Sequence, residues 1–329
     1  MVSKKLGSSF SEKRFACPPV PDTETGKTVF EPEDGGSGNW VGGPDTVYDP
    51  ETNRFYMYHR VRKPIGEGRG SVARIGESKN GLDFEVIWKA KKDELNAESL
   101  EVGSLIKDPA SGIWRLYISF QPKGTEGWQV ALVEADSPGE LELSEWRTVM
   151  LPEDYGLFSL KDPRIYHVGG QYYAYVCVDQ EGKFRTIEKD GAEIRIPNGF
   201  DSTGLMTSPD GKHWKNFRYV LQSGSGQGTQ PRDYKARLNS IVWLAPLFIG
   251  FYDGGETFYD NFEEKTGLAT STDLINWTKV PLSEPWIDSS HGTVRYLDAL
   301  RRRDKIHYYY EYTRSDGSHE IRANVESLG

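Results

Sequence analysis

This 329-residue chain has little cysteine, no net positive charge and no long apolar run, and each shortage excludes a class of protein. Two cysteines, Cys17 and Cys177, cannot build a disulfide framework, and Cys177 lies in an apolar run where we expect a small buried hydrophobe. The net charge of −9 argues against a nucleic-acid partner. No apolar run approaches the roughly 18 residues of a membrane-spanning helix, so we expect no membrane partner.

The sequence motifs of several enzyme classes are missing as well. There is no His-Glu-x-x-His, no paired Cys-x-x-Cys and no phosphate-binding loop that leads into a helix. We therefore expect no required cofactor and assign no residue as a metal ligand. Residues 1–9 carry positive charge without an apolar segment, which is not typical of a signal peptide. We expect either a cytoplasmic protein or the mature form of a secreted or periplasmic protein.

What the chain has in abundance is a repeated aromatic segment. Residues 54–58, 113–117, 171–175, 247–251 and 305–309 resemble one another, and their last aromatics lie 59, 58, 76 and 58 residues apart. Self-similarity at a near-constant period is typical of repeat architectures, and aromatic and β-branched residues favour strands. We predict an all-β fold, a five-bladed β-propeller with four antiparallel strands in each blade.

A second repeat marks the outer hairpins of the blades. Residues 78–84, 208–214 and 271–277 share a Ser, an Asp or Asn two residues later, and an aromatic six residues after the Ser. Asp and Asn side chains hydrogen-bond to nearby backbone in turns. We expect turns between third and fourth strands, with the aromatic ring packed between blades. Residues 136–146 have the same place in the second unit.

The repeats indicate one propeller domain over residues 40–329. The expected blades begin near residues 45, 101, 159, 237 and 291. The last blade is short of a fourth strand, and residues 27–30 of the N-terminal segment 1–39 are expected to supply it. That strand would close the ring and cover a sheet edge.

Long loops are predicted to gather on one face. The connections at 62–70, 179–200, 222–236 and 254–266 are long, whereas those of the opposite face are short. Long loops in a compact domain are usually functional. We therefore predict a ligand site at the axis on the face with the long loops.

Polar residues lie where the inner strands are expected to begin at this face. Clustered carboxylates are what glycosidic bond cleavage needs, since one acid protonates the leaving oxygen and another carboxylate activates water or stabilises the oxocarbenium ion. Arg and His can hydrogen-bond sugar hydroxyls, and Trp or Tyr can stack on a sugar ring. The catalytic candidates are Asp45, Glu101 and Asp162, and the candidates for holding a substrate are Trp40, His59, Arg60, Glu98, Arg164, Arg237, Asn239, Asp253 and His291.

Each candidate also has a structural interpretation. Asp45 could order the turn after Pro44, and Asp162 could cap a backbone amide. Glu98 and Glu101 could be solvated loop carboxylates, and the two histidines could lie in the core.

Three of these segments resemble elements of five-bladed propeller glycosidases. They are residues 161–165 (Lys-Asp-Pro-Arg-Ile), the Ser-x-Asp hairpins, and residues 266–271 (Thr-Gly-Leu-Ala-Thr-Ser). The superfamily includes glycoside hydrolase family 43, invertase-like fructosidases, and the mannoside phosphorylases and mannosidases of family 130. The resemblance covers most of residues 40–325 and implies an exo-acting glycosidase for small oligosaccharides or glycosides derived from plant, algal or microbial polysaccharides. Related propellers sometimes hold a structural cation on the axis.

The resemblance assigns roles only in part. In the arabinanase-like pattern Asp45 matches the general base, and Asp162 matches the aspartate that orients the acid. The acid itself is a Glu at the start of the fourth blade, where this chain has Arg237-Leu-Asn239. The replacement acids considered are Glu98, Glu101, Asp253 and Glu256.

Two further functions stay open at this point. The phosphorylase pattern has an acidic residue before Asp-Pro-Arg-Ile, whereas this chain has Lys161. Basic residues that would suit a phosphate, a uronic acid or a sulfated sugar are His59, Arg60, Arg62, Arg164 and Arg237. The alternatives to a hydrolase are therefore a mannoside-type phosphorylase and a carbohydrate-binding propeller without catalysis.

Overall fold

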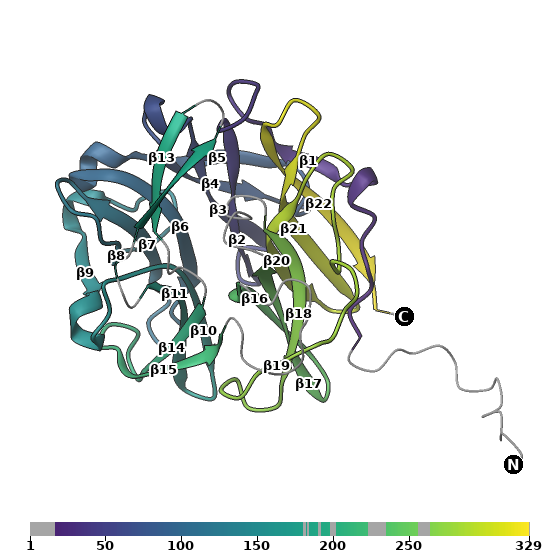
Figure 1. Ribbon diagram of the computed structural model, residues 1–329. Helices are drawn as coiled ribbons and strands as arrows, with labels where there is room; N and C mark the ends of the chain where they lie inside the picture. Colours follow the sequence, from purple (N-terminus) through teal and green to yellow (C-terminus); the bar gives the residue numbers. More distant parts are fainter. Residues whose placement is uncertain are drawn as a thin grey trace, which may run out of the picture.

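The computed structural model describes residues 17–179, 182, 184–189, 192–197, 202–222, 235–255 and 264–328, which form β-strands joined by turns and short 3₁₀ segments (Figure 1). The first strands are β1 (Lys27–Phe30), β2 (Trp40–Asp49), β3 (Arg54–Arg62), β4 (Gly70–Ser78), β5 (Phe84–Lys91), β6 (Ala97–Lys107), β7 (Trp114–Pro122), β8 (Gln129–Ala135) and β9 (Arg147–Met150). The middle strands are β10 (Ser159–Val168), β11 (Gln171–Asp179), β12 (Phe184–Lys189), β13 (Ala192–Pro197), β14 (Ser202–Ser208) and β15 (Lys215–Leu221). The last are β16 (Arg237–Leu244), β17 (Leu247–Gly254), β18 (Lys265–Ser271), β19 (Thr278–Lys279), β20 (Val294–Arg302), β21 (Lys305–Thr313) and β22 (His319–Ser327).

The 3₁₀ segments are η1 (Thr23–Thr25), η2 (Ile65–Glu67), η3 (Lys92–Leu95), η4 (Leu143–Glu145) and η5 (Pro152–Tyr155). Within the described residues, no helix has the length and apolar character that a membrane crossing requires.

The strands pair in consecutive antiparallel groups, which we call sheets I to V. Sheet I is β2-β3-β4-β5, sheet II is β6-β7-β8-β9, sheet III is β10-β11-β14-β15, sheet IV is β16-β17-β18-β19, and sheet V is β20-β21-β22. The hairpin β12-β13 is inserted in sheet III, and a parallel bridge between Trp40 and His319 joins sheets I and V. The all-β fold predicted from the aromatic repeat is confirmed.

The N-terminal strand β1 adds a fourth strand to sheet V. It pairs antiparallel with β22, with Lys27 opposite Ala323 and Thr28 opposite Arg322. Phe30 at its end stacks on His59, with 4.0 Å between the ring centroids. The pairing covers the free edge of β22, which would otherwise present unpaired backbone groups, and it is the pairing expected for residues 27–30.

The outer hairpins form the predicted turns. In one of them Asp273 Oδ1 accepts the backbone N–H groups of Ile275 and Asn276, at 2.9 and 2.7 Å. The aromatic rings that follow, Phe84, Trp214 and Trp277, stand edge-on to Tyr309, Tyr117 and Tyr175 of the preceding sheet, at 6.0, 5.9 and 6.2 Å. The same three tyrosine hydroxyls donate to turn carbonyls of the next sheet, those of Gly81, Gly211 and Leu274. The repeat therefore encodes the contacts between sheets.

The apolar core lies between the sheets. Its five clusters of buried side chains fall between sheets I and II, II and III, III and IV, IV and V, and V and I. Cys177 is buried in sheet III, as expected.

Side chains also link the innermost strands, which face the middle of the molecule (Figure 1). In each inner strand, a polar side chain accepts the backbone N–H of the next inner strand. The pairs are Asp45 with Leu105, Ser104 with Ile165, Tyr166 with Ile241, Ser240 with Ala299, and Asp298 with Thr46, at 2.7, 3.0, 2.7, 2.9 and 2.7 Å. The fifth link thus returns to the strand of the first.

Every inner strand carries a β-bulge just before these linking residues. The register shifts fall between Gly42 and Asp45, Leu100 and Gly103, Lys161 and Arg164, Leu238 and Ser240, and Arg295 and Asp298. A bulge bends its strand and re-aims a side chain. The five bulges bring polar side chains together at one end of the inner strands, where the candidate site lies.

Candidate active site

Among the residues that the structure describes, buried or nearly buried charged side chains meet at this end of the inner strands, and we call eleven of them the axial charge cluster. Its cations are Arg60, Arg62, Lys161, Lys235, Arg237 and Arg295, and its carboxylates are Glu101, Asp162, Asp253, Glu264 and Glu311. The inner strands supply residues at or beside the bulges. The second strands supply Arg60, Asp253 and Glu311, each two residues after the repeat aromatic and therefore on the same face of its strand.

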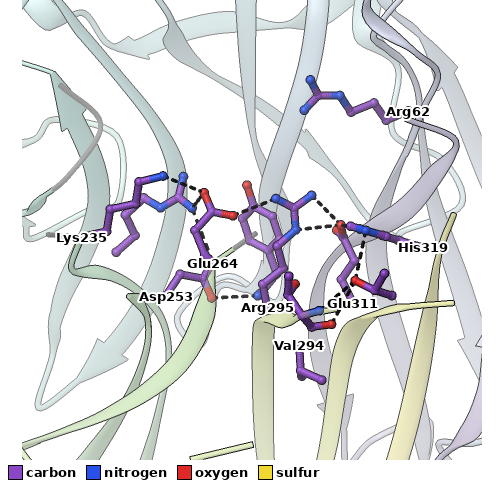
Figure 2. A network of polar contacts seen from close by, with 12 residues as sticks. Arg62, Lys235, Asp253, Glu264, Val294, Arg295, Glu311 and His319 are labelled. Atoms are coloured by element: carbon purple, nitrogen blue, oxygen red, sulfur yellow. Dashed lines mark hydrogen bonds and ion pairs between the residues drawn. The ribbon is translucent and has the colours of Figure 1, made fainter. Parts of the chain in front are cut away.

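Arg295 connects the two halves of the cluster. Figure 2 shows its guanidinium between the carboxylates of Glu264 and Glu311. Its Nη1 lies 2.9 Å from Glu264 Oε2, and its Nη2 lies 2.7 Å from Glu311 Oε1. His319 Nδ1 lies 2.6 Å from the same Glu311 oxygen. Burial opposes ionisation of Glu311, but Arg295 and Arg60 hold the pKa of its carboxyl well below the usual range. Glu311 is therefore a fixed anion.

A glycine makes room for Glu311. A Cβ atom at Gly42 would overlap the Glu311 carboxylate, whose nearest oxygen is 1.6 Å from that position. The sequence at the first bulge therefore has Gly at 42 because a charged side chain of sheet V occupies the space.

Glu101 is clamped by two arginines. Arg60 Nε donates to Glu101 Oε2 at 2.7 Å, and Arg62 Nη1 lies 3.5 Å from Oε1. Burial would raise the pKa of Glu101, but Arg60, Lys161 and Arg62 outweigh it and lower the pKa to about 2. A carboxyl that stays ionised to such low pH cannot deliver a proton near neutrality, so Glu101 is unsuited to be the acid.

Asp253 has the opposite electrostatic environment. Its Oδ1 accepts the backbone N–H of Tyr296 at 3.1 Å, while the Arg237 guanidinium is 3.9 Å from Oδ2. Burial is the largest effect, and together with Glu264 it raises the pKa of Asp253 to about 6 in spite of Arg237. Asp253 can therefore carry a proton at mildly acidic pH.

Asp162 is held in a strained backbone conformation. Its φ of 54° is left-handed, which costs a non-glycine residue roughly 1–2 kcal/mol. Its backbone N–H donates to Ser119 Oγ at 2.7 Å. Its Oδ1 is buried without a hydrogen-bond partner in the described part of the chain, and Lys161 Nζ lies 3.7 Å from Oδ2. Strain of this kind gathers at functional sites, and the lone pairs of Oδ1, which accept no hydrogen bond from the described residues, suit contact with a ligand.

Asp45 is tied into the links between inner strands. Its Oδ2 accepts the N–H of Leu105 at 2.7 Å, and Arg164 Nη1 lies 3.0 Å from Oδ1. Burial raises the pKa of Asp45 against the opposing effect of Arg164. Asp298, which the sequence analysis missed, lies close by, and burial together with Asp45 raises its pKa to about 7. Both Asp45 oxygens are therefore already engaged with protein groups.

The three predicted catalytic carboxylates do come together. Glu101, Asp162 and Asp45 all act on Tyr58, whose pKa is raised mainly by burial and further by these three negative charges. The Tyr58 hydroxyl donates to the backbone carbonyl of Glu101 at 2.6 Å. These three carboxylates therefore lie near one another.

Several predicted binding residues also lie here. The Trp40 ring stacks on His319 with 4.6 Å between centroids. Arg237 contacts the Glu264 carboxylate directly, and the Asn239 side chain, beside Asp253, lowers the pKa of that carboxyl against the larger effect of burial. Arg164 pairs with Asp45 as described.

Three predicted binding residues are not part of the site. His59 is fully buried against Phe30 of β1, because alternate residues of a strand point to opposite faces and Arg60 takes the face toward the axis; burial and Arg74 lower the pKa of His59 to about 3. Glu98 is exposed and accepts the N–H of Gly124 at 3.4 Å. His291 is exposed on the loop before β20. Glu256 lies outside the described residues.

The error at His291 came from the alignment of the fifth inner strand. The bulge of that strand brings Tyr296 and Asp298 to the site, beyond the predicted position at 291–293. A signal was present, because Asp298 pairs with Tyr309 as Asp45 pairs with Tyr58. Counting back from the repeat aromatic would have found it.

The sequence contained a signal for one of the other missed residues and none for the rest. Glu311 lies two residues after Tyr309, the position that Arg60 has after Tyr58, so the repeat contained a signal for it. Glu264 and Lys235 stand in long connections without periodicity, and no signal marked them. Among the residues that the structure describes, no group of three or more His, Cys, Asp or Glu is arranged to hold a metal ion.

No known protein family and no curated protein sequence matched this chain. Solved structures did match over nearly the whole chain. A family 43 glycoside hydrolase from Xanthomonas citri, complexed with xylotriose, is 13% identical with a TM-score of 0.61, over 91% of this chain and 90% of that one. A β-1,2-mannobiose phosphorylase from Listeria innocua is 14% identical with a TM-score of 0.59, over 95% and 93%.

A third similar structure performs a different reaction. It is an N-acetylgalactosamine deacetylase from F. plautii in complex with blood group B trisaccharide, 12% identical with a TM-score of 0.61, over 94% of each chain. Identities this low establish a common fold and leave the reaction to the site. The resemblance predicted from the sequence is confirmed at this level: the chain has the fold shared by propeller glycoside hydrolases of family 43 and the mannobiose phosphorylase.

Proposed function

We propose that this protein is a glycoside hydrolase of the five-bladed propeller type, which cleaves oligosaccharides derived from polysaccharides from one end. In this proposal the five sheets are the blades of a closed ring, with β1 as the fourth strand of sheet V. Support for closure comes from the core clusters between all five pairs of neighbouring sheets and from the hydrogen bond of Asp298 back to the first inner strand.

One observation carries the proposal. The axial charge cluster has buried donors and buried acceptors that lack hydrogen-bond partners among the described residues, including Arg60 Nη1, Asp162 Oδ1 and Asp253 Oδ2. Buried polar atoms in native proteins are nearly always satisfied, and exceptions call for an explanation such as a ligand. Sugar hydroxyls both donate and accept, so a sugar could satisfy guanidinium and carboxylate groups together.

Two different carboxyl groups supply the proton donor and the opposing carboxylate of the proposed reaction. We assign Asp253 as the general acid, because it is the carboxyl of the cluster with a pKa raised to about 6. We assign Asp162 as the opposing carboxylate, which activates water or stabilises positive charge at the anomeric carbon. Asp253 would protonate the glycosidic oxygen as the bond to the anomeric carbon breaks.

Asp45 takes a supporting role in this proposal. The sequence favoured it as the base, but both of its oxygens engage protein groups, so it holds Arg164 and the inner strand of sheet II in place. The Asp45→Asn and Asp162→Asn variants separate the two assignments. We expect Asp162→Asn to lower kcat by roughly a hundredfold or more with little change in Tm. We expect Asp45→Asn to lower Tm clearly and to lower kcat by a smaller factor than Asp162→Asn does.

The experiment that tests the function is a screen of the purified protein against aryl glycosides and natural oligosaccharides, each with and without inorganic phosphate. The panel includes arabinofuranosides, xylosides, mannosides, fructosides and galactosides. Release of one sugar without phosphate supports the hydrolase, and the size of the products tests cleavage from a chain end. Release only with phosphate would replace it by a phosphorylase, and glycan binding without any product by a carbohydrate-binding protein.

A further inference from the structure

We propose that the hydroxyl of Tyr296 is a further catalytic group, which hydrogen-bonds to a hydroxyl of the sugar held between Asp162 and Asp253. This role rests on the proposed function, because it requires that a sugar is bound and cleaved at the axis. It adds a neutral side chain to the two carboxyl groups assigned to the reaction. Tyr296 belongs to the inner strand β20.

The backbone of Tyr296 has a conformation that a large side chain rarely adopts. Its φ is 50°, and it is the first residue inside the bulge between Arg295 and Asp298. The first residue inside the bulge of β2 is Gly43, with a φ of 63°. Glycine takes this conformation without steric cost, whereas a bulky residue there is an outlier. A tyrosine where glycine would fold more easily indicates that its side chain serves the site.

The hydroxyl of Tyr296 has no hydrogen bond with a described residue, although the residue is only 4% exposed. Every other described tyrosine of equal or smaller exposure hydrogen-bonds through its hydroxyl. Tyr58, for example, donates to the carbonyl of Glu101, and Tyr175 donates to that of Leu274, both at 2.6 Å. Buried tyrosine hydroxyls usually find a partner, so that of Tyr296 is available to a ligand.

Two arginines hold the Tyr296 ring in place. The guanidinium carbons of Arg60 and Arg295 lie 5.3 and 5.2 Å from the ring centroid. Both guanidinium groups are attracted to the π-electrons of the ring. A phenylalanine at this position keeps these contacts and the backbone, so the hydroxyl can be removed by itself.

The hydroxyl lies among charged groups of the axial charge cluster. The charges that act most strongly on it are those of Asp162, Arg237 and Glu101. Burial is the largest effect on the pKa of Tyr296, and together with Asp162 and Glu101 it raises this pKa against Arg237 and Arg295. The hydroxyl therefore keeps its proton at neutral pH, and it can both donate and accept a hydrogen bond.

Tyr296 is connected to both carboxyl groups of the proposed reaction. Its backbone N–H donates to Asp253 Oδ1 at 3.1 Å, while Asp253 Oδ2 has no hydrogen-bond partner among the described residues. Asp162 Oδ1 is buried and equally without a described partner. A sugar hydroxyl that accepts from Tyr296 can donate to Asp162 Oδ1, and Asp253 Oδ2 is left to protonate the glycosidic oxygen. Hydrogen bonds to sugar hydroxyls near the anomeric carbon strengthen in the transition state.

The test compares the wild-type protein with Tyr296→Phe on a matched set of substrates. They are the aryl glycoside of the screen that is cleaved fastest and its monodeoxy derivatives, each of which lacks one sugar hydroxyl. We expect Tyr296→Phe to lower kcat/KM for the parent glycoside at least about tenfold. For one monodeoxy derivative the loss should be within about twofold, because the hydroxyl that Tyr296 binds is already missing. For the other derivatives it should stay about tenfold.

The matched control is Tyr175→Phe. It removes a hydroxyl that donates to the Leu274 carbonyl in the core between sheets III and IV. This variant should lower Tm and leave kcat/KM within about twofold, whereas Tyr296→Phe should keep Tm within about 2 °C of the wild type.

The outcomes separate the role of Tyr296 from the proposed function. An unchanged kcat/KM in Tyr296→Phe would overturn the role and keep the hydrolase. An equal loss on the parent and on every monodeoxy derivative would also overturn it, since a structural disturbance affects all substrates alike. If the glycosides bind without being cleaved, the hydrolase is wrong, and the same tenfold and twofold ratios in Kd, measured by calorimetry, would keep the sugar contact. Equal ratios in Kd, or no binding of any glycoside, would overturn the contact.

Discussion

At the scale of single residues, the environment gives identical carboxyl groups different chemistry. Glu101 is paired with two arginines and has a pKa lowered to about 2, whereas Asp253 is buried with Arg237 at 3.9 Å and has a pKa raised to about 6. Pairs of titratable groups pushed apart in this way are a common sign of acid and base roles. The choice of Asp253 as the acid follows from this contrast.

We expect Asp253→Asn to lower kcat/KM by roughly a hundredfold to ten-thousandfold, the usual contribution of a general acid. The amide keeps an oxygen that can accept the Tyr296 N–H, so the fold should be retained. In the wild-type protein an acid must be protonated, so kcat/KM should fall as the pH rises through about 6. Steady-state rates from pH 4 to 9 measure both effects.

The substrate that distinguishes this role has an activated leaving group. An aryl glycoside with a very acidic phenol needs little protonation, so Asp253→Asn should lose much less activity on it than on a natural oligosaccharide. Equal losses on both substrates, or an unchanged pH profile, would contradict the assignment.

At the scale of elements, a short N-terminal strand stabilises a sheet whose other strands come from the end of the chain. β1 is four residues long, yet it pairs with β22 and places Phe30 on His59 and near Phe84, with centroids 4.0 and 6.0 Å apart. An added strand satisfies backbone groups of the edge, and an aromatic ring gives it apolar contact. Sheet V therefore depends on residues almost 300 positions away in sequence.

Phe30→Ala is expected to lower the free energy of unfolding by about 2–4 kcal/mol, as removal of a partly buried aromatic ring from a packed contact does. Chemical denaturation measures the change. Thr28→Ala in the same strand is the matched control and should cost less than about 1 kcal/mol. If the two variants were equally stable, the ring would not hold β1 in place.

At the scale of the whole molecule, buried charges set how stability depends on pH. The pKa of Glu101 is lowered to about 2, and those of Glu264 and Glu311 are lowered as well. Their stabilisation is present above the ordinary glutamate value of 4.5 and is lost as the pH falls. The pKa of Asp298 is raised from the ordinary aspartate value of 3.8 to about 7, so its contribution is fully present below 3.8 and is lost as the pH rises from there through 7. Stability should therefore peak near the ordinary glutamate value of 4.5, where the loss from the glutamates has nearly ended and the loss from Asp298 is still incomplete.

We expect the free energy of unfolding to be greatest near pH 4.5 to 5 and to fall by roughly 2–4 kcal/mol by about pH 7, since one pKa unit corresponds to about 1.4 kcal/mol. Asp298→Asn should flatten this fall, because an amide at 298 can still accept the Thr46 N–H without titrating. Urea denaturation at several pH values measures it. A fall as steep in the variant as in the wild type would show that another group is responsible.

Much of the fold could be predicted because residues that repeat along the sequence specify its strands and turns. The aromatic of each repeat pairs with the linking position of the inner strand, and the Ser-x-Asp turns set the outer hairpins. These are local or strictly repeated features, so counting along the chain finds them. The candidate site was predicted in part for the same reason, as Asp45, Glu101 and Asp162 lie at repeat positions.

The sequence by itself determined most strands, their turns and four of the carboxylates near the axis, Asp45, Glu101, Asp162 and Asp253, because local patterns specify them. The tertiary structure alone decided which groups each of these residues contacts. It turned His59 toward Phe30, engaged both oxygens of Asp45, and brought Glu264 from a non-repeating connection to Arg295. Charge balance and burial depend on neighbours from distant parts of the chain, and no spacing along the sequence encodes them.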